Sequence, residues 1–406
     1  MGQKIIMNKI PAIISGKPTF EKPFPINNPI VDTYWQKEPL TTAFDEIFSS
    51  NMLTGEQKYQ LEFEKKICEI TNAKHAVALA NCTSGLMLAI QAITSQSTSG
   101  VAEKEAILPA FSFAATAHAA AWNRCSLKFV DIDDTLCLDP ECVKNAITDK
   151  TALILGVHMY GCPCHPEKLD EISKETGIPI IFDAAHAIGA SINGKPLGEF
   201  AQAHIFSFSP TKLITTIEGG MLITNDDELA QKIRLDRNYS NPPNYWTERC
   251  GLSARLGEPG AALGLVQLAD IDSFISNRNA FVTQYKSLLE KVPGITFQNI
   301  PDGYQSSHKD FSIFINADDF GMNRDQLVKT LEAENIMTKN YFYPPLNIIK
   351  PYAEHKDLHL PITKEKSESV VSLPIYNYMN NNDIQTIAGA IISAHQYAKE
   401  ILDALN

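Results

Sequence analysis

Three polar groups stand at apolar positions of this 406-residue chain where they could do chemistry. Lys212 lies within FSFSPTKLITTIEGG (206–220), Asp183 follows IPIIF, and Thr83 and Ser84 open a helix-like segment after HAVALAN. A lysine enclosed by apolar residues has a lowered pKa and can act as a nucleophile or form a Schiff base. A buried carboxylate needs a positive partner. Hydroxyls and free backbone N–H groups at the start of a helix bind anions.

Each of these residues also has an ordinary structural explanation. Lys212 could extend its ammonium to solvent from a loop. Asp183 could cap the helix that follows its strand, and Thr83 or Ser84 could be simple N-cap residues. The combination is more specific than any member, because pyridoxal 5′-phosphate (PLP) requires an anion site for its phosphate, a carboxylate for its pyridine nitrogen and a lysine for its aldehyde.

Two further residues fit the same interpretation. Phe113, in PAFSFAAT, could stack on the face of the cofactor ring. Ser207, five residues before Lys212, offers a second hydroxyl for the phosphate. There is no Walker P-loop and no GxGxxG sequence, so the two commonest glycine-rich phosphate loops are absent.

The elements that position these residues alternate along the first part of the chain. Short β-rich segments are separated by segments of helical length, which predicts a mainly parallel sheet covered on both faces. The segments read as strands are 75–81, 105–110, 126–133, 151–161, 178–186, 204–209 and 219–226. We expect an α/β domain over residues 15–265, preceded by an N-terminal segment (1–14). In open α/β sheets, ligands bind at the carboxyl ends of the strands, where the candidate residues stand.

The remainder of the chain predicts a smaller α+β domain over residues 266–406. A single long helix is expected from Pro259 through GAALGLVQLADIDSFISNRNAFVTQYKSLLEKV. DFSIFINA (310–317) is typical of a strand, and NRDQLVKTLEAEN (323–335) is typical of a helix opened by an asparagine cap.

The composition excludes several classes of function. A formal net charge of −12 disfavours a general nucleic-acid binder, which needs many cationic contacts to phosphates. No apolar run reaches the ~18 residues that span a membrane. The first twenty residues lack the core and cleavage site of a secretory signal, so we expect a cytoplasmic protein with no membrane partner and free thiols at its eight cysteines.

Taken together, these motifs resemble those of the DegT/StrS family of sugar aminotransferases, within the PLP-dependent enzymes of fold type I. The segments DAAH (183–186) and FSFSPTKLITTIEGG are the most specific in their order and spacing. The resemblance covers most of the chain and extends through GKPTFEKPFP, MLTGEQKYQLEFEKKI, ALANCTSGLMLAI, LPAFSFAATAHAA, GVHMYGCPCHPEKL, GLSARLGEPGAALGLVQLADIDSFISNR and YFYPPL.

The resemblance implies a role for each cofactor-binding position. Lys212 would bind PLP covalently, Asp183 would pair with the pyridinium nitrogen, and His186 would lie near the phenolic oxygen. The remaining implied residues are Phe113, stacked on the ring, and Thr83, Ser84 and Ser207, at the phosphate. In the family, an asparagine reaches the phosphate of the partner subunit in a homodimer with active sites at the interface; Ser253 stands there in GLSARL, and Asn347 stands where the family often has histidine.

The implied reaction moves an amino group from L-glutamate to the ketone of a nucleotide-linked keto-deoxysugar, for deoxyamino sugar biosynthesis. The most similar branch is that of the dTDP-4-amino-4,6-dideoxyglucose transaminases, which predicts carbon 4 of dTDP-4-keto-6-deoxyglucose as the acceptor. A carbon-3 aminotransferase and a non-catalytic regulator are the alternatives. Lys212 argues against the family branch that has histidine there and dehydrates sugars. Candidate substrate residues are Arg255 and Tyr341, with Arg234, Arg237, Arg249 and Tyr343 as further candidates.

A metal site is the competing hypothesis from another class. CPCH brings Cys162, Cys164 and His165 together, and His355 and His359 have the i,i+4 spacing of a helix. No second cysteine pair follows the first, and HKDLH lacks the glutamate of a zincin. We therefore expect no bound metal and read these cysteines as ordinary thiols.

Overall fold

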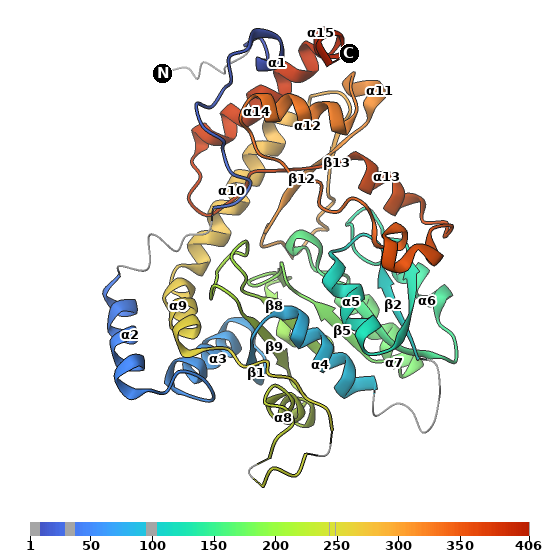
Figure 1. Ribbon diagram of the computed structural model, residues 1–406. Coiled ribbons are helices and arrows are strands. Elements are labelled where there is room, and N and C mark those ends of the chain that lie inside the picture. The colour runs from blue at the N-terminus through green and yellow to red at the C-terminus, as the bar shows by residue number, and fades with distance from the viewer. Residues whose placement is uncertain (1–8, 29–36, 95–103, 243, 248, 406) are drawn as a thin grey trace.

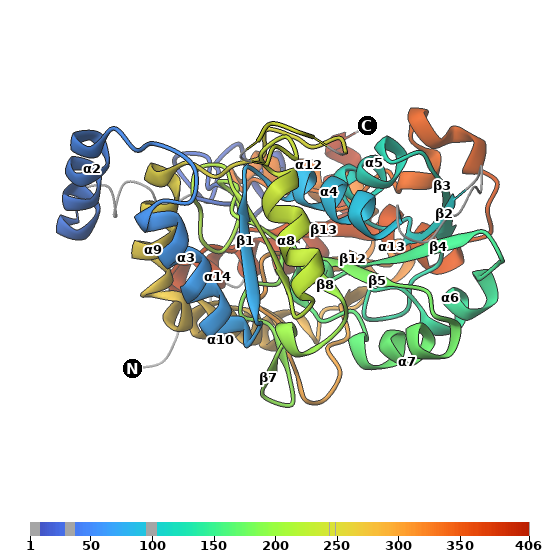
Figure 2. The same ribbon diagram turned by 90° about the horizontal axis from the view of Figure 1, so that it is seen from below.

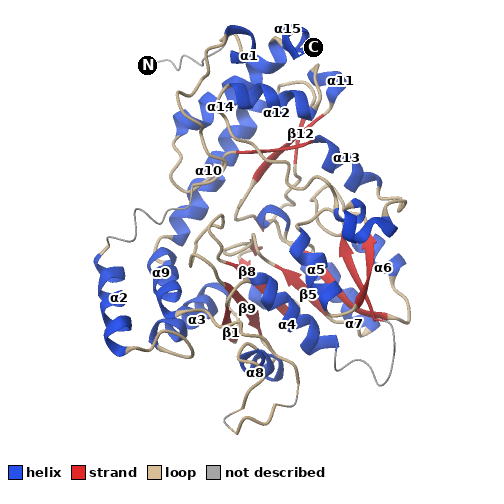
Figure 3. Cartoon of the chain, viewed as in Figure 1, coloured by secondary structure: helices blue, strands red, loops and turns tan. Residues whose placement is uncertain are grey.

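The computed structural model describes residues 9–28, 37–94, 104–242, 244–247 and 249–405, so the first eight residues of the expected N-terminal segment lie outside it. The main sheet has seven strands in the order β1-β9-β8-β5-β4-β2-β3 (Figure 3). Only β9 runs antiparallel to its neighbours in this sheet, so the predicted α/β class with a mainly parallel sheet is confirmed. The strands are β1 (His75–Leu79), β2 (Lys104–Pro109), β3 (Cys125–Val130), β4 (Thr151–Val157), β5 (Ile180–Asp183), β8 (Ala203–Ser207) and β9 (Gly220–Thr224).

Helices cover both faces of this sheet because its strands are apolar on both sides. Figure 2 shows strands β4 and β5 between α4 and α5 on one side and α6 and α7 on the other. Leu222 of β9 packs in the cluster beneath α4, whereas its neighbours Met221 and Ile223 pack beneath α3 and α9. The covering helices are α3 (Lys58–Thr71), α4 (Cys82–Thr94), α5 (Ala114–Trp122), α6 (Pro140–Ala146), α7 (Pro166–Thr176), α8 (Asp227–Asp236) and α9 (Glu258–Leu268).

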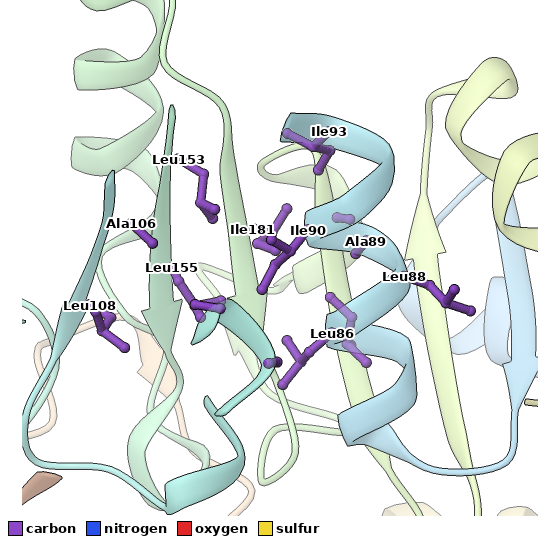
Figure 4. Close-up of a cluster of buried hydrophobic side chains, with 14 of the residues drawn as sticks. Leu86, Leu88, Ala89, Ile90, Ile93, Ala106, Leu108, Leu153, Leu155 and Ile181 are labelled. Carbon is purple, nitrogen blue, oxygen red and sulfur yellow. The ribbon is translucent and has the colours of Figure 1, made fainter. Parts of the chain in front are cut away.

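Helix α4 is anchored to the sheet by a continuous apolar face. Figure 4 shows Ile90 of α4 beside Ile181 of β5, with Leu155 of β4 nearby. All three side chains are fully buried, and such burial contributes about 1.5–3 kcal/mol for each side chain. The start of α4 is thereby held against the carboxyl ends of the strands.

The C-terminal unit is built on a small antiparallel sheet, β10-β12-β13, and lies above the large sheet in Figure 1. The expected asparagine cap is confirmed, since Asn323 and Gln326 form a reciprocal capping box at the start of α12. Its principal elements are α10 (Ile271–Leu289), β10 (Ile295–Phe297), β12 (Phe311–Ile315), α12 (Arg324–Ala333), β13 (Val370–Leu373), α14 (Asn381–Gln396) and α15 (Ala398–Leu405). The remaining elements are α1 (Ala12–Ser15), α2 (Glu38–Ser50), η1 (Met159–Gly161), β6 (Ser191–Ile192), β7 (Lys195–Pro196), η2 (Leu197–Glu199), β11 (Tyr304–Gln305), α11 (Ala317–Phe320), η3 (Leu346–Ile348), η4 (Lys350–His355) and α13 (Pro361–Ser369).

The single long helix expected after Pro259 is wrong, because two helices occupy this region. Helix α9 ends at Leu268 and α10 begins at Ile271. The Asp270 N–H donates to the Gln267 carbonyl three residues back, which is a turn rather than a continuing α-helical bond. Since α9 packs on the large sheet and α10 carries the C-terminal core, we propose that the domain boundary lies at this turn.

The segment before residue 28 packs on the C-terminal unit, although the sequence predicts that the large domain begins at residue 15. Phe20 and Phe24 pack against the C-terminal core, and Phe24 forms a β-bridge with Ile336. The backbone N–H groups of Ala12 and Thr19 donate to the buried Glu334 carboxylate, at 2.6 and 2.7 Å. We therefore propose that the large unit begins after this segment.

Within the described ranges, none of the helices combines the length and apolar character needed to cross a membrane.

Candidate active site

A cavity of about 200 Å³ lies at the carboxyl ends of the parallel strands. Most of its lining residues directly follow a strand, as expected for a ligand site in an open α/β sheet. By strand, they are Asn81, Cys82 and Thr83 after β1; Ser112, Phe113 and Ala115 after β2; Val157, His158 and Met159 at β4; Asp183, Ala185 and His186 at β5; and Ser207, Ser209 and Lys212 at β8. Glu218 and Phe342 complete the lining. The structure thus brings Lys212, Asp183 and His186 into one cavity.

Lys212 lies on the loop between β8 and β9, and hydrogen bonds fix this loop. The Phe208 N–H donates to the Gly219 carbonyl and the Thr216 N–H donates to the Phe208 carbonyl, both at 2.9 Å. The Gln267 side chain of α9 accepts from the Thr215 N–H at 3.1 Å and donates to its carbonyl at 2.7 Å. The lysine backbone is therefore held in one place before any ligand binds.

The second glycine of the EGG sequence is required by a close approach of backbones. A Cβ atom on Gly220 would lie 2.5 Å from the carbonyl carbon of Asn81 and 2.7 Å from the Cys82 nitrogen. Because Asn81 immediately precedes α4, a side chain at residue 220 would displace the start of that helix. The motif therefore allows the lysine loop and the helix start to lie against each other.

Lys212 is partly buried, and its surroundings make its amine weakly basic. Burial, followed by the positive charge of Lys309, lowers its pKa to about 8. Asp310, Cys82 and Asp183 oppose this shift. About a tenth of the amine is consequently neutral at pH 7, and this neutral form is the one that acts as a nucleophile or base.

Asp183 is 5% exposed and is oriented by three donors. Thr116 Oγ1 donates to Oδ2 at 2.7 Å, the Ala185 N–H donates to Oδ1 at 3.1 Å, and the Cys82 thiol contacts Oδ1 at 3.8 Å. Burial raises the pKa of the Asp183 carboxyl, while these bonds and the Lys212 charge oppose the rise. The bond from Ala185 closes a local turn rather than the helix cap considered from the sequence, since β5 is followed by β6, and the carboxyl also faces the cavity.

His186 presents a buried nitrogen without a partner to this cavity. Its Nδ1 has no hydrogen bond within the described residues, and its ring stacks on Phe342 with centroids 6.3 Å apart and planes at 12°. Ser307 Oγ donates to the His186 carbonyl at 2.6 Å. Burial and the charges of Lys212 and Lys309 hold the pKa of His186 well below its usual range, so the ring is neutral.

The residues expected at the phosphate do not all reach the cavity. Thr83 and Ser207 line it, and α4 begins at its edge. Ser84 does not line it, because its hydroxyl donates to the Asn81 carbonyl at 2.9 Å and its N–H donates to Asn81 Oδ1 at 2.8 Å. Asn81, rather than Thr83 or Ser84, therefore caps α4, and Ser84 lies in the first turn of this helix.

A neutral histidine pair was missed from the sequence: His158 lines the cavity, and His204 is its hydrogen-bond partner. The Cys164 N–H donates to His158 Nδ1 at 2.9 Å, so His158 Nε2 carries the proton and donates to His204 Nδ1 at 3.1 Å. His204 Nε2 then donates to the Phe200 carbonyl at 2.8 Å. Burial lowers the pKa of both rings, that of His204 to about 4, which agrees with two neutral rings.

Three predicted residues lie away from the cavity lining. Ser253 is exposed, and its hydroxyl accepts from Arg255 Nη2 at 3.2 Å. The Arg255 guanidinium lies 5.6 Å from the centroid of the Tyr239 ring. Tyr341 directly precedes the cavity residue Phe342, and its backbone carbonyl accepts a hydrogen bond from the Tyr160 hydroxyl. Their roles remain predictions.

Three of the arginines considered for a nucleotide are occupied by structural contacts. Arg237 is buried and pairs with Glu64 at 2.7 Å, and Arg249 pairs with Asp236 at 2.8 Å. Arg234 donates to a β1 carbonyl, that of Ala76, at 2.9 Å. These contacts tie the three guanidinium groups to α3, α8 and β1, while the buried Arg249 Nη2 has no hydrogen bond among the described residues.

The cysteine and histidine residues of the metal hypothesis do not assemble. Across the residues that the structure describes, no group of three or more His, Cys, Asp or Glu side chains is placed to hold a metal. All eight cysteines are free thiols. His355 ends the short helix η4 and His359 lies beyond it, so the predicted helical spacing of this pair is wrong.

The residues in the cavity fit the cofactor that the sequence predicts. Lys212 has a weakly basic amine, and the buried Asp183 carboxyl is aligned by hydrogen bonds. His186 Nδ1 has no hydrogen-bond partner among the described residues. Phe113 is 61% exposed and lies at the cavity, with its centroid 6.1 Å from that of Phe342. This set matches the amine, acid and stacking groups that PLP requires.

Comparison with known proteins gives an independent result. The model of the DegT/DnrJ/EryC1/StrS aminotransferase family matches residues 36–392. The chain is 31% identical over 382 residues to a dTDP-4-amino-4,6-dideoxy-D-glucose transaminase of Escherichia coli, covering 92% of this chain and 99% of that protein. It is 33% identical over 385 residues to a pleiotropic regulatory protein of Geobacillus stearothermophilus, covering 92% and 100%. A crystal structure of DesI in the presence of its TDP-sugar product superimposes with a TM-score of 0.88 at 30% identity, covering 97% of this chain and 98% of that one.

Proposed function

Because the chain belongs to the DegT/DnrJ/EryC1/StrS aminotransferase family, we propose that it transfers an amino group from L-glutamate to the ketone of a nucleotide-linked keto-deoxysugar. Its cofactor is PLP. The observation that carries this proposal is the convergence of Lys212, Asp183 and His186 on one cavity at the carboxyl ends of the strands. The low basicity of the Lys212 amine supports its assignment as the residue that binds PLP covalently.

PLP, when bound, supplies an electron sink for the bonds at the amino acid α-carbon. Lys212 would take the proton from that carbon and return it to the aldehyde carbon of the cofactor, which requires an amine that is neutral part of the time. Asp183 stabilises a proton on the pyridine nitrogen. His186 Nδ1 donates or accepts at the phenolic oxygen, and Phe113 covers the ring.

The phosphate would be held by Thr83, Ser207 and the start of α4, because the N-terminus of a helix favours an anion. Ser84 supports this end indirectly, by closing the first turn of α4. Lys212, Asp183 and the phosphate site would thus bind the cofactor at three separate points.

For the acceptor we propose carbon 4 of dTDP-4-keto-6-deoxyglucose. The support is the likeness to the transaminase of Escherichia coli and to DesI with its TDP-sugar product. The carbon-3 ketone is the alternative, and Arg255 and Tyr341 are the proposed substrate contacts.

The test is a pair of half-reactions on the purified enzyme. Added L-glutamate is expected to remove the visible absorption of bound PLP and to release 2-oxoglutarate. A panel of keto-sugar nucleotides is then expected to restore the absorption, with dTDP-4-keto-6-deoxyglucose acting fastest and mass spectrometry and NMR locating the new amine. An amine at carbon 3 would replace the proposed acceptor.

A regulator is the second candidate, favoured by the likeness to the pleiotropic regulatory protein. A pure binder has no need of a weakly basic lysine beside an aligned carboxylate, so the cavity supports catalysis instead. The glutamate half-reaction separates the two, since a binder would keep its visible absorption and release no 2-oxoglutarate.

We further propose a homodimer whose active sites lie at the interface. Large apolar side chains are exposed around the cofactor loop and the GLSARL segment, among them Ile217 at 58% and Tyr239 at 53%. Ser253, which stands in the position of the asparagine that crosses between subunits, is exposed beside them. Light scattering is expected to give twice the 44.9 kDa chain mass.

Ser253→Asp tests the shared site, because it would place a negative charge near the partner's phosphate site. PLP affinity is expected to fall at least about tenfold, since juxtaposed like charges cost several kcal/mol. Ser126→Asp, at an exposed position of β3, is the matched control. An unchanged dissociation constant for PLP in Ser253→Asp would contradict the shared site.

A further inference from the structure

Lys309 and Asp310 form a buried ion pair close to the cofactor cavity. Their side chains are only 5% and 7% exposed, and Lys309 Nζ lies 2.7 Å from Asp310 Oδ1. The other carboxylate oxygen, Oδ2, has no hydrogen-bond partner among the described residues. Removing two charges from water costs several kcal/mol for each ion, so such a pair is weak evidence for stability. Its position suggests a role in the site instead.

The backbone that carries this pair is rigidly held. The Arg278 guanidinium donates to the carbonyls of His308 and Lys309, at 3.0 and 2.8 Å, and is itself 1% exposed. The Lys309 N–H donates to the Tyr160 carbonyl at 2.9 Å. Two residues earlier, Ser307 holds the carbonyl of His186. The same segment therefore supports both the ion pair and a residue that lines the cavity.

The Lys309 ammonium contacts the wall of the cavity through an aromatic ring. Its Nζ lies 5.2 Å from the centroid of the Tyr341 ring, within the range of a cation–π interaction. The next residue, Phe342, lines the cavity and stacks on His186. The contacts thus lead from Lys309 through Tyr341 and Phe342 to His186.

We propose that Lys309 is a positioning residue of the active site, whose ammonium fixes the Tyr341–Phe342 wall and presents a second positive charge toward Lys212. The proposal rests on the proposed function, in which Lys212 binds PLP. Lys309 does not line the cavity, so it acts through Tyr341 and through its charge.

The electrostatics of the site agree with this placement. The largest charge effects on Lys212 come from Lys309, Asp310, Cys82 and Asp183, and of these four only Lys309 lowers its pKa. His186 and Glu218 line the same cavity. Lys309 also contributes to the lowered pKa of His186. Asp310 opposes the effect on Lys212, so the two members of the ion pair act in opposite directions on the same amine.

The test measures the pH at which the visible absorption of PLP changes in the purified holoenzyme. Lys309→Met keeps the length of the side chain and removes the charge, so the protonated nitrogen that joins Lys212 to PLP is stabilised. The midpoint is expected to rise by about one pH unit. Lys309→Arg is expected to keep the wild-type midpoint, and Asp310→Asn to move it downward.

The kinetic constants provide a second test of the proposal. Lys309→Met is expected to lower kcat for the glutamate half-reaction severalfold and to shift its pH profile upward, with a smaller change in KM for glutamate, because Tyr341 is the proposed contact of the other substrate, the sugar nucleotide. Equal midpoints in wild type, Lys309→Met and Lys309→Arg, with PLP bound in all three, would overturn the proposal. If Lys309→Met does not fold, Asp310→Asn and Lys309→Arg test the proposal in its place. An unchanged absorption midpoint in Asp310→Asn would also overturn the proposal. A Lys212→Ala variant that kept the PLP absorption would instead refute the proposed function.

Discussion

Replacing Lys212 by alanine is expected to lower turnover by about 10⁴-fold, the upper range for a positioned acid–base group. The same change is expected to abolish the visible absorption that PLP has when joined to a lysine. Both losses have one cause, since the amine that binds the cofactor is also the group that moves the proton. The loop stays in place, because its hydrogen bonds run through Phe208, Thr215 and Gln267 rather than through the lysine side chain.

Lys195→Ala is the matched control for this experiment. Lys195 is exposed in the β6–β7 hairpin and does not line the cavity, so its loss is expected to change neither absorption nor turnover. Thermal unfolding should confirm that both variants fold. An active, coloured Lys212→Ala enzyme would contradict the assignment of this residue and with it the proposed mechanism.

The lysine loop shows how far the sequence could predict the site. Asp183, His186, Ser207 and Lys212 follow the ends of strands whose apolar character is continuous, and parallel strands bring such positions to one edge. Their convergence therefore needs only the strand pattern and the sheet. This prediction does not require the order of the strands within the sheet, because all parallel strands end at the same edge.

Side chains that act across long sequence distances could not be predicted in this way. Thr116 bonds to Asp183 from 67 residues away, and as one hydroxyl in an alanine-rich segment it gave only a weak signal. Phe342 reaches the cavity from the C-terminal part of the chain, so its role depends on how the two units meet. Ser84 was ambiguous for a local reason, since a hydroxyl at a helix start can serve a ligand or its own backbone.

The helix break at Asp270 and the packing of Phe24 were missed for a different reason. Apolar periodicity continues through a two-residue turn, so it predicts one helix where tertiary packing forms two. The N-terminal segment has no strong periodicity of its own. The position of this segment depends on the buried carboxylate of Glu334. This carboxylate accepts hydrogen bonds from two backbone N–H groups of the segment and forms an ion pair with Lys9.

Asp183→Asn is expected to lower kcat by about 10²–10³-fold, the usual effect of removing one preorganised charge from a reacting site. Asparagine keeps the shape of the side chain and an oxygen for the Ala185 N–H, and its NH2 group can donate to the Thr116 hydroxyl, but it no longer stabilises a proton on the pyridine nitrogen. The fold should tolerate the change, because burial already disfavours the charged carboxyl and raises its pKa. We therefore expect the unfolding temperature of the PLP-free protein to be almost unchanged, while the visible absorption remains because Lys212 is intact.

Thr116→Val gives the intermediate point that distinguishes a catalytic charge from a structural side chain. It removes the 2.7 Å hydrogen bond to Asp183 Oδ2 but leaves the carboxylate with Ala185 and Cys82, so kcat is expected to fall only about tenfold. If Asp183 served only to cap the turn at Ala185, asparagine would replace it with little loss of kcat. Thr116→Val would then lower kcat as much as Asp183→Asn does. A graded loss in kcat, with KM for glutamate changed less, is the result that a charge at the pyridine nitrogen requires. Equal kcat values for wild type and Asp183→Asn would show that this carboxylate does not act on the cofactor.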